Sequence, residues 1–290
     1  MQTQLSSSKL EVVINHHGAE LCSVKSKSGL EYVWQAKPEV WARHAPVLFP
    51  IVGKLKNNTY NYRAKEYELN QHGLARDMVF ECVERIENAA LFKLNSSQET
   101  KQIYPFDFEL NILYQLQEDN LSITYSVKNP SLENIFFSIG AHPAFKCPLF
   151  ENEKWEDYYL LFENHEYTIS KLNEGLISDE KQIIFCNNNK LFLSNRTFEN
   201  DALVFENNQI QKVSLCSSIS KSKITLTSYN WPYFGIWSKK QSKAFVCLEP
   251  WYGVADHENT NSNIEQKRGI IKLPPDQEFK ANYSIRFESE

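Results

Sequence analysis

The sequence has no apolar run that approaches the roughly 20 residues a membrane-spanning helix needs, so we expect no membrane association. Residues 1–9 are polar and rich in serine, and they lack the apolar segment of a secretory signal peptide. The six cysteines are scattered singly, without the CxxC pairs of zinc sites or the even spacing of a disulfide framework. We therefore expect reduced thiols and a cytoplasmic location.

Several catalytic signatures are also missing. The chain contains no Gly-x-Ser-x-Gly elbow, no HExxH pair and no cluster of histidines or cysteines with metal-ligand spacing. The Gly53-Lys54 pair lacks the spacing of a phosphate-binding loop. Charged residues make up 23% of the chain and the formal net charge is −5, which gives no electrostatic reason to expect nucleic acid as a partner. These absences predict a protein that acts on a small molecule without metal or other cofactor.

Helical periodicity is almost absent, whereas strand alternation is common. It is clearest over residues 108–116 and 121–127, which residues 117–120 join as a hairpin. The 18 Phe, 14 Tyr and 6 Trp favour strands and also suit a carbohydrate cleft, although core packing is their commoner use. No linker or internal repeat divides the chain. We predict an all-β protein with one domain over residues 1–290.

His142 is the first candidate functional residue. The apolar run at 135–139 ends at Gly140, and Pro143 then fixes the backbone directly after the imidazole. We expect the strand to end there and a turn to follow, which would aim His142 at a concave face. Histidine is a natural proton donor or acceptor near neutral pH. For an isolated histidine, burial against a backbone carbonyl would be the more ordinary interpretation.

Other candidates have similar positions. His72 precedes a glycine with Arg76 four residues on, Asp201 precedes the buried run at 202–205, and Glu249 lies between Leu248 and a Pro-Trp pair. Apolar neighbours are expected to raise the pKa of Glu249, because desolvation disfavours its charged form. Taken singly, Arg76 would be interpreted as one member of a surface ion pair, and Asp201 as a residue that caps a helix or strand. Together these residues predict two-sided acid–base chemistry on a small polar substrate.

Five stretches carry a recognisable pattern in the order of the chain. They are Ala45–Gly53 (APVLFPIVG), Gln71–Arg76 (QHGLAR), Gly140–Phe145 (GAHPAF), Asp201–Leu203 (DAL) and Leu248–Gly253 (LEPWYG). The ordered set resembles one family, the aldose 1-epimerases (galactose mutarotase-like), and within it the LacX-like and glucose-6-phosphate 1-epimerase-related branch. The resemblance implies a large antiparallel β-sandwich of the supersandwich kind, with a sugar cleft on one concave sheet.

The resemblance also implies catalytic roles. His142 matches the general acid that protonates the ring oxygen of an aldohexose. Glu249 matches the general base that takes the proton from the anomeric hydroxyl, and His72 matches a second histidine that hydrogen-bonds near the ring oxygen. The implied activity is the interconversion of α and β anomers by ring opening.

Substrate-binding roles follow from the same resemblance. Asp201 matches a carboxylate that holds sugar hydroxyls, and Arg76 follows the HGxxR pattern of the branch. Lys54 stands near the position where the main branch has an Asn-Arg pair; it keeps the charge but loses the bidentate fork. If Lys54, Arg76 and Arg43 converge, they would form a phosphoryl site. If they diverge, free aldohexoses would be preferred, and we favour this second case.

Alternatives remain open at this point. A sugar-binding or regulatory protein could use the same cleft without turnover, although such a binder needs no matched acid–base pair. A hexose-6-phosphate 1-epimerase is a further alternative. A glycosidase or lyase would need two carboxylates that flank a glycosidic oxygen, and only Glu249 and Asp201 could serve. The sequence is compatible with a monomer or a homodimer.

Overall fold

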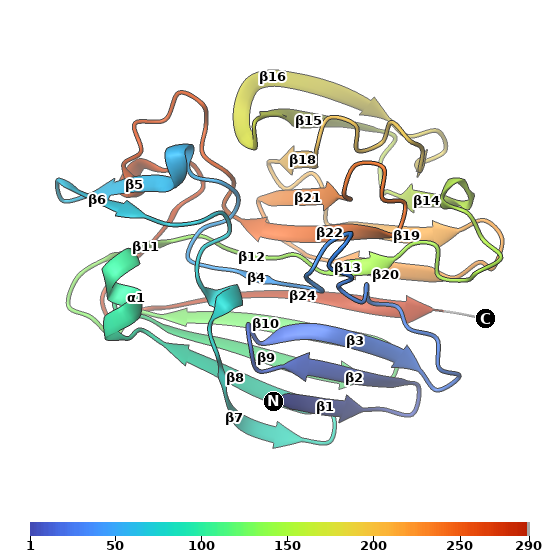
Figure 1. Cartoon of the computed structure of the whole chain (residues 1–290), viewed down its shortest axis with the longest axis horizontal. Helices are drawn as coiled ribbons and strands as arrows, with labels where there is room; N and C mark the ends of the chain where they lie inside the picture. Colours follow the sequence, from blue (N-terminus) through green and yellow to red (C-terminus); the bar gives the residue numbers. More distant parts are fainter. Residues whose placement is uncertain (289–290) are drawn as a thin grey trace.

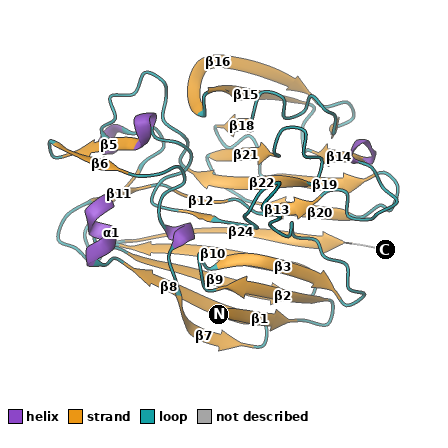
Figure 2. Cartoon of the chain, in the orientation of Figure 1, coloured by secondary structure: helices purple, strands orange, loops and turns teal. Residues whose placement is uncertain are grey.

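The computed structural model describes residues 1–288, and these residues form an antiparallel β-structure with few helical turns (Figures 1 and 2). The largest sheet has nine strands in the order β17 (Lys190–Phe192), β14 (Tyr158–Leu161), β19 (Lys212–Ser217), β20 (Lys223–Thr227), β24 (Glu278–Glu288), β10 (Asn120–Lys128), β9 (Glu109–Gln117), β8 (Ala89–Asn95) and β7 (Glu81–Ile86).

An eight-stranded sheet packs against it. Its order is β16 (Leu176–Phe185), β15 (Glu166–Asn173), β18 (Leu203–Glu206), β21 (Tyr233–Trp237), β22 (Phe245–Tyr252), β12 (Ile139–Ala141) and β4 (Val47–Leu48), and β13 (Ala144–Lys146) also pairs with β22. Smaller sheets are formed by β1 (Gln2–Ser6), β2 (Leu10–Asn15) and β3 (Glu20–Ser26), by β5 (Thr59–Tyr62) and β6 (Lys65–Glu68), and by β11 (Ile135–Phe137) and β23 (Ile271–Leu273). The helical segments are α1 (Gln98–Ile103) and the 3₁₀ turns η1 (Lys56–Asn58), η2 (Ala75–Asp77), η3 (Trp155–Asp157) and η4 (Ile264–Gln266).

The hairpin of β9 and β10 confirms the clearest pattern in the sequence. Its strands pair in register from Asn120 opposite Gln117 to Lys128 opposite Glu109, and a tight turn joins them at Glu118, which has a positive φ. Buried and more exposed residues alternate along both strands for most of their length. The alternation places one face of the hairpin in the core, as expected for strands with a side-chain period of two.

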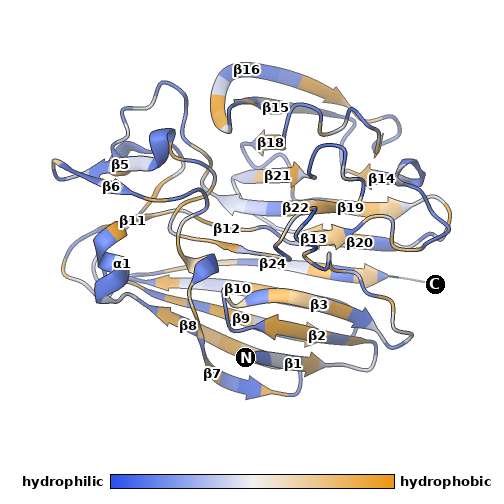
Figure 3. Cartoon of the chain, in the orientation of Figure 1, coloured by the Kyte–Doolittle hydropathy of each residue, from blue (hydrophilic) through white to orange (hydrophobic). Residues whose placement is uncertain are grey.

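The two large sheets bury one continuous apolar core between them. Ile112 and Ile123 contribute from the nine-stranded sheet, and Phe205, Val246 and Leu248 contribute from the eight-stranded sheet. Figure 3 shows hydrophobic residues concentrated on the strands of both sheets and hydrophilic residues on most of the connecting loops. The predicted all-β sandwich is therefore confirmed. Within residues 1–288, no helix is long and apolar enough to cross a membrane.

Strand β22 positions the site, because its alternate residues face opposite ways. Val246 and Leu248 point into the core between the sheets, so Cys247, Glu249 and Trp251 point to the other face of the same sheet. That second face is itself covered, and seven of the eight residues of β22 are buried. A carboxylate on this face is held by a central strand and is shielded from water.

His142 lies in a break of the neighbouring strand. β12 pairs with β22 through Gly140 opposite Trp251, and the chain resumes as β13 with Ala144 opposite Cys247. The turn expected after Pro143 is therefore absent. The chain instead continues along β22 in unchanged register, with the Leu248 N–H donating to the Pro143 carbonyl at 3.2 Å. This register places His142 opposite Glu249, so the two side chains lie on the same face of the sheet.

Candidate active site

A cavity of about 380 Å³ opens on the covered face of the eight-stranded sheet. Five of the six predicted site residues line it. They are His72, Arg76, His142, Asp201 and Glu249, and they come from segments far apart in the sequence. The volume lies within the range of about 300–1,000 Å³ that is typical of small-molecule sites.

Glu249 lies at the buried end of this cavity and is only 1% exposed. Burial raises the pKa of its carboxyl group well above the usual value, and the negative charge of Asp201 raises it further, while the nearby Trp251 indole opposes the rise. The Trp251 ring lies across glycines of both adjacent strands, since a Cβ at Gly235 would come within 2.3 Å of it and a Cβ at Gly140 within 2.7 Å. The two glycines thus make room for the aromatic floor beside the carboxylate.

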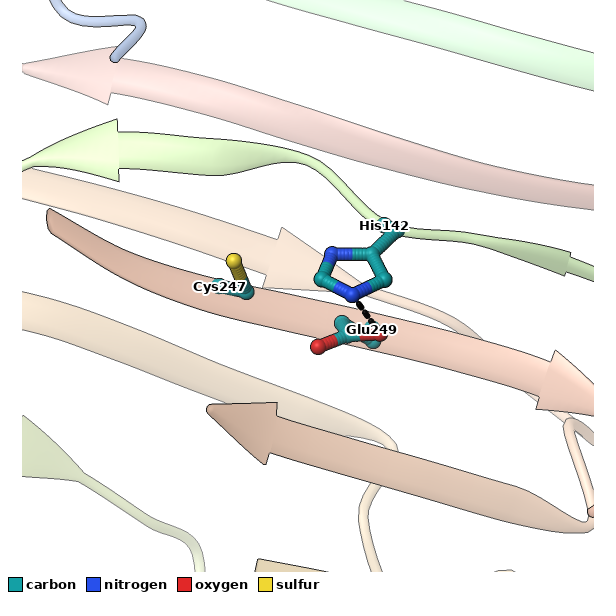
Figure 4. Close-up of side chains that lie close together, drawn as sticks. All are labelled: His142, Cys247 and Glu249. Atoms are coloured by element: carbon teal, nitrogen blue, oxygen red, sulfur yellow. Dashed lines mark ion pairs between the residues drawn. The ribbon is translucent and has the colours of Figure 1, made fainter. Parts of the chain in front are cut away.

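His142 faces Glu249 directly, with its Nε2 atom 3.3 Å from Oε2 (Figure 4). The Trp41 ring stacks on the imidazole at a centroid distance of 5.0 Å, and Trp237 meets it edge-on at 5.7 Å. Burial lowers the pKa of His142 to about 3, and the positive charge of Arg76 contributes to the decrease. Apart from the His142–Glu249 contact itself, neither His142 Nδ1 nor Glu249 Oε2 meets a hydrogen-bond partner within residues 1–288 although both are buried, so they are available to a bound molecule.

The two shifts have one cause. Burial disfavours charge on either group, so it raises the carboxyl pKa and lowers the imidazole pKa. Because the groups are in contact, the pair titrates as a unit. Between its two pKa values the pair holds one proton, and burial favours the neutral arrangement, with that proton on Glu249 rather than on His142.

His72 is fixed by the backbone. Its N–H donates to the Gly53 carbonyl at 2.9 Å, and the Gly53 N–H donates to Nδ1 at 3.2 Å. Since Nδ1 accepts, the neutral ring carries its proton on Nε2. This tautomer requires the Gln71 side-chain amide, 3.3 Å from Nε2, to present its oxygen there. Burial holds the pKa of His72 well below the usual value, with further contributions from His142 and Arg76. His72 is therefore a neutral hydrogen-bond donor, and its ring lies 5.4 Å from that of His142.

The arginines near the site have different partners. Arg76 lines the cavity, donates from Nη2 to the Gln71 carbonyl at 2.6 Å, and has its Nε atom 3.7 Å from Asp77. Arg43 pairs with the same aspartate at 2.7 Å and donates to the Arg76 carbonyl at 3.3 Å. Asp77 thus holds Arg43 outside the cavity.

Asp201 and Lys54 lie toward the solvent. Asp201 is exposed, has a φ of +77°, and accepts the N–H of Ala202 at 2.8 Å just before β18 begins. Lys54 does not line the cavity. Its ammonium donates to the Glu174 carbonyl at 3.0 Å and faces a neighbouring hollow. A direct role for Lys54 in binding the substrate stays a prediction.

Three tryptophans of the site were not among the predicted site residues. Trp251 lies two residues beyond Glu249 and so shares its face, and Trp237 lies opposite Cys247 on β21. Either could have been inferred from strand periodicity once Glu249 was chosen. Trp41 comes from an irregular segment with no strand neighbour, and no pattern in the sequence connects it to His142.

One group of side chains resembles a metal-binding set. The potential ligand atoms of His142, Cys247 and Glu249 all lie within 4.8 Å of one another (Figure 4). Nitrogen, sulfur and oxygen donors of this kind suit zinc. Burial and Glu249, however, raise the pKa of the Cys247 thiol, which opposes formation of the thiolate that a metal needs. The expected independence of metal stays a prediction and is tested below.

Fold and site together define a β-sandwich with an acid–base pair buried in a cavity large enough for a small molecule. A sequence model of the family described as aldose 1-epimerase matches residues 1–286. Protein LacX (plasmid) from Lactococcus lactis subsp. lactis is 34% identical over 295 residues, which cover 98% of this chain and 99% of that relative.

Two solved structures are also similar over their whole length. A galactose mutarotase related enzyme from Lactobacillus acidophilus has 37% identity and a TM-score of 0.95, covering 100% of this chain and 98% of that one. A galactose mutarotase-like protein from Lactobacillus casei has 29% identity and a TM-score of 0.91, covering 99% and 100%. The chain belongs to the aldose 1-epimerase family, which confirms the resemblance seen in its motifs.

Proposed function

We propose that the protein is an aldose 1-epimerase that interconverts the α and β anomers of a neutral aldohexose by acid–base ring opening. The observation that carries this proposal is the buried contact between His142 and Glu249, 3.3 Å apart at the closed end of the cavity. A protein that only binds sugars gains nothing from burying two groups that can exchange a proton. General acid–base catalysis by such groups contributes about 10²- to 10⁴-fold each.

The reaction starts from the charged form of the pair. Glu249 takes the proton of the anomeric hydroxyl while His142 gives its proton to the ring oxygen, and the C1–O5 bond breaks to leave the open-chain aldehyde. The pair is then neutral, which is the arrangement that burial favours. The aldehyde group rotates about C1–C2, and closure on its other face reverses both transfers.

The other cavity residues position the sugar in this scheme. His72 presents an Nε2–H donor beside the imidazole of His142, where it can hydrogen-bond the ring oxygen. Arg76 donates to hydroxyl groups, and Asp201 accepts from them at the outer end of the cavity. The rings of Trp41, Trp237 and Trp251 supply apolar faces for the C–H surfaces of the sugar.

The placement of the cations supports a neutral substrate. Arg76 is the only lysine or arginine among the described residues that line the cavity. Arg43 is held by Asp77, and Lys54 is held by the Glu174 carbonyl outside the cavity. A phosphoryl dianion is normally bound by several converging cationic donors. The three cations diverge, and this favours free aldohexoses over hexose 6-phosphates.

Polarimetry tests the proposal. The decay of optical rotation of freshly dissolved α-glucose, α-galactose and α-glucose 6-phosphate is followed with and without purified protein. We expect faster decay for the free sugars. A preference above tenfold for the phosphate that is lost in Arg76→Ala would refute the neutral substrate. If calorimetry shows sugar binding but polarimetry shows no acceleration of mutarotation, the proposed enzymatic function would be refuted and a non-catalytic sugar-binding protein would be supported.

A further inference from the structure

Lys267 and Asp256 form a buried ion pair that the mechanism proposed above does not use. The two residues are 6% and 2% exposed, and the lysine Nζ donates to the aspartate Oδ1 at 2.9 Å. Replacing a buried ion pair with apolar residues of similar volume is often neutral or stabilising, because the cost of desolvation offsets the attraction between the charges. Stability alone therefore does not account for this pair.

Lys267 holds one wall of the cavity. Besides the carboxylate, its ammonium binds the Val254 carbonyl at 2.7 Å, and both Val254 and Ala255 line the cavity. Gly53 packs on this wall so closely that a Cβ there would lie 2.7 Å from the Ala255 backbone. Gly53 also has a φ of +74°, so glycine is required at this contact. The ammonium thus fixes the surface against which Gly53 packs.

Asp256 holds the chain that follows Gly53. Its carboxylate accepts the Lys56 N–H at 3.0 Å, and its own N–H donates to the Lys54 carbonyl at 2.8 Å. Lys56 is the first residue of η1, where a backbone N–H has no partner within the helical turn. Two hydrogen bonds from one buried residue therefore set the position of the chain immediately after Gly53.

Gly53 in turn sets the state of His72. Its N–H donates to Nδ1 of the imidazole at 3.2 Å, and its carbonyl accepts the His72 N–H at 2.9 Å. A neutral imidazole has one N–H, so a donor at Nδ1 leaves that proton on Nε2, on the ring that meets His142 edge-on. A displacement of Gly53 would remove this donor, and both tautomers of His72 would then be populated.

We propose that Asp256 and Lys267 are positioning residues for the reaction, because their ion pair holds Gly53 in place and Gly53 fixes the tautomer and orientation of His72. Neither residue lines the cavity, so both act through the backbone that they bind. The expected effect on the rate rests on the proposed epimerase function. The tautomer of His72 does not, and it can be measured whether or not the protein is an epimerase.

Lys56→Pro tests the contact between Asp256 and the chain after Gly53, because it removes the N–H that the carboxylate accepts. Proline fits the first residue of η1, and the preceding Leu55 is already extended, with a ψ of 146°. Lys56→Ala is the matched control, since it also loses the ammonium but keeps the N–H. Both variants retain the buried ion pair.

Two measurements follow these variants. Two-bond ¹H–¹⁵N spectra of protein labelled with ¹⁵N-histidine distinguish protonated from unprotonated ring nitrogens, and the signals that disappear in His72→Gln belong to His72. We expect mixed tautomers in Lys56→Pro and the Nε2–H form in the parent and in Lys56→Ala. In polarimetry, Lys56→Pro should lower kcat by up to about 10²-fold and change KM less, because the Nε2–H donor acts where charge develops in the transition state.

Two double variants test the ion pair itself. Asp256→Leu/Lys267→Met removes both charges without leaving one of them unpaired, and it should reproduce the changes in kcat and in the tautomer with a urea midpoint close to that of the parent. Asp256→Asn/Lys267→Gln removes the charges but keeps donors and acceptors, so it should restore the Nε2–H form and most of kcat. Lys93→Met/Glu109→Leu removes a half-buried ion pair of the nine-stranded sheet and should change neither.

The outcomes separate this inference from the proposed function. A single Nε2–H tautomer and a parental kcat in Lys56→Pro would overturn the positioning role, and this variant decides the matter even if the apolar double variant does not fold. Equal changes in Lys56→Pro and Lys56→Ala would also overturn it, because they would result from loss of the ammonium. If the parent does not accelerate mutarotation, the epimerase function is refuted, and the spectra alone then decide whether the ion pair sets the tautomer of His72.

Discussion

Replacing Glu249 with glutamine tests the acid–base pair most directly. The amide has the shape of the carboxyl group and fits the same buried position, which is 1% exposed. It cannot accept the anomeric proton from a position 3.3 Å from His142 Nε2. We expect kcat to fall by about 10²- to 10⁴-fold, which corresponds to about 2.7–5.4 kcal/mol of lost transition-state stabilisation.

The same substitution should stabilise the fold. The pKa of Glu249 is raised in the folded protein, so below pH 4.5 both folded and unfolded states are protonated and the carboxyl carries no penalty. As pH rises above 4.5, the unfolded state ionises first, and the free energy of unfolding falls until the raised pKa is passed. Glutamine removes this penalty, which amounts to about 1.4 kcal/mol for each unit of the rise.

Glu206 provides a matched control, because it is a buried glutamate whose pKa is shifted in the opposite direction to that of Glu249. It is 4% exposed but pairs with Lys181 and Arg268, and these charges and hydrogen bonds hold its pKa below the usual value despite burial. Glu206→Gln should therefore lower the free energy of unfolding at pH 7, and the loss should shrink as pH falls through the lowered pKa.

The assays are polarimetry for kcat and urea unfolding, followed by tryptophan fluorescence, at pH 7 and pH 4. We expect Glu249→Gln to be less active and more stable than the parent at pH 7, with the gain in stability nearly gone at pH 4. A kcat within tenfold of the parent would refute the catalytic role. If the difference in free energy of unfolding between Glu249→Gln and the parent is the same at both pH values, the conclusion that burial destabilises the charged form of Glu249 would be refuted.

Four further predictions concern the same cavity. Catalysis should require the His142–Glu249 pair to hold one proton. We expect kcat/KM to fall below about pH 3, because His142 is then protonated as well as Glu249 and the pair holds two protons. We also expect kcat/KM to fall as pH rises through the raised carboxyl pKa, because the pair then loses its last proton. Asp201→Asn removes a charge that raises the Glu249 pKa and should move the alkaline limb to lower pH; an unmoved limb would count against this coupling. Dialysis against a chelator should leave activity unchanged. Loss of activity that is recovered on adding zinc would show that His142, Cys247 and Glu249 hold a required metal. Gly235→Ala would bring a Cβ within 2.3 Å of Trp251, so it should lower both kcat and, by about 1–3 kcal/mol, the free energy of unfolding in a urea titration.

The residues that were predictable from sequence are those with local signals. The β9–β10 hairpin followed from alternation, because one face of each strand is buried. Glu249 and His142 were recognisable by their apolar or glycine–proline surroundings. Such signals depend only on residues within a few positions along the chain, so they can be recognised in the sequence without knowledge of the fold.

The parts of the structure that the sequence did not indicate depend on contacts between distant segments. The strand expected to turn after Pro143 continues because β22 offers hydrogen bonds on both sides of the break. Lys54 lies outside the cavity, after a turn at Gly53 that has a positive φ and where a Cβ would lie 2.7 Å from the Ala255 backbone. Trp41 reaches His142 through aromatic packing with Phe245. Each of these contacts joins segments that are far apart in the sequence, so neither segment alone predicts it.

The break between β12 and β13 has a consequence for how this protein can diversify. The proposed acid His142 lies between β12 and β13, opposite the proposed base Glu249 on β22, so the spacing of the ladder, about 4.8 Å between strands, determines how far apart they lie. The residues at the outer end of the cavity come instead from turns and loops, such as the turn at Gly175 and the loop that ends at Asp201. Changes in those loops can alter which molecules are accepted while the reacting geometry is inherited intact. Chemistry and selectivity are thus encoded in separate parts of the chain and are free to change at different rates.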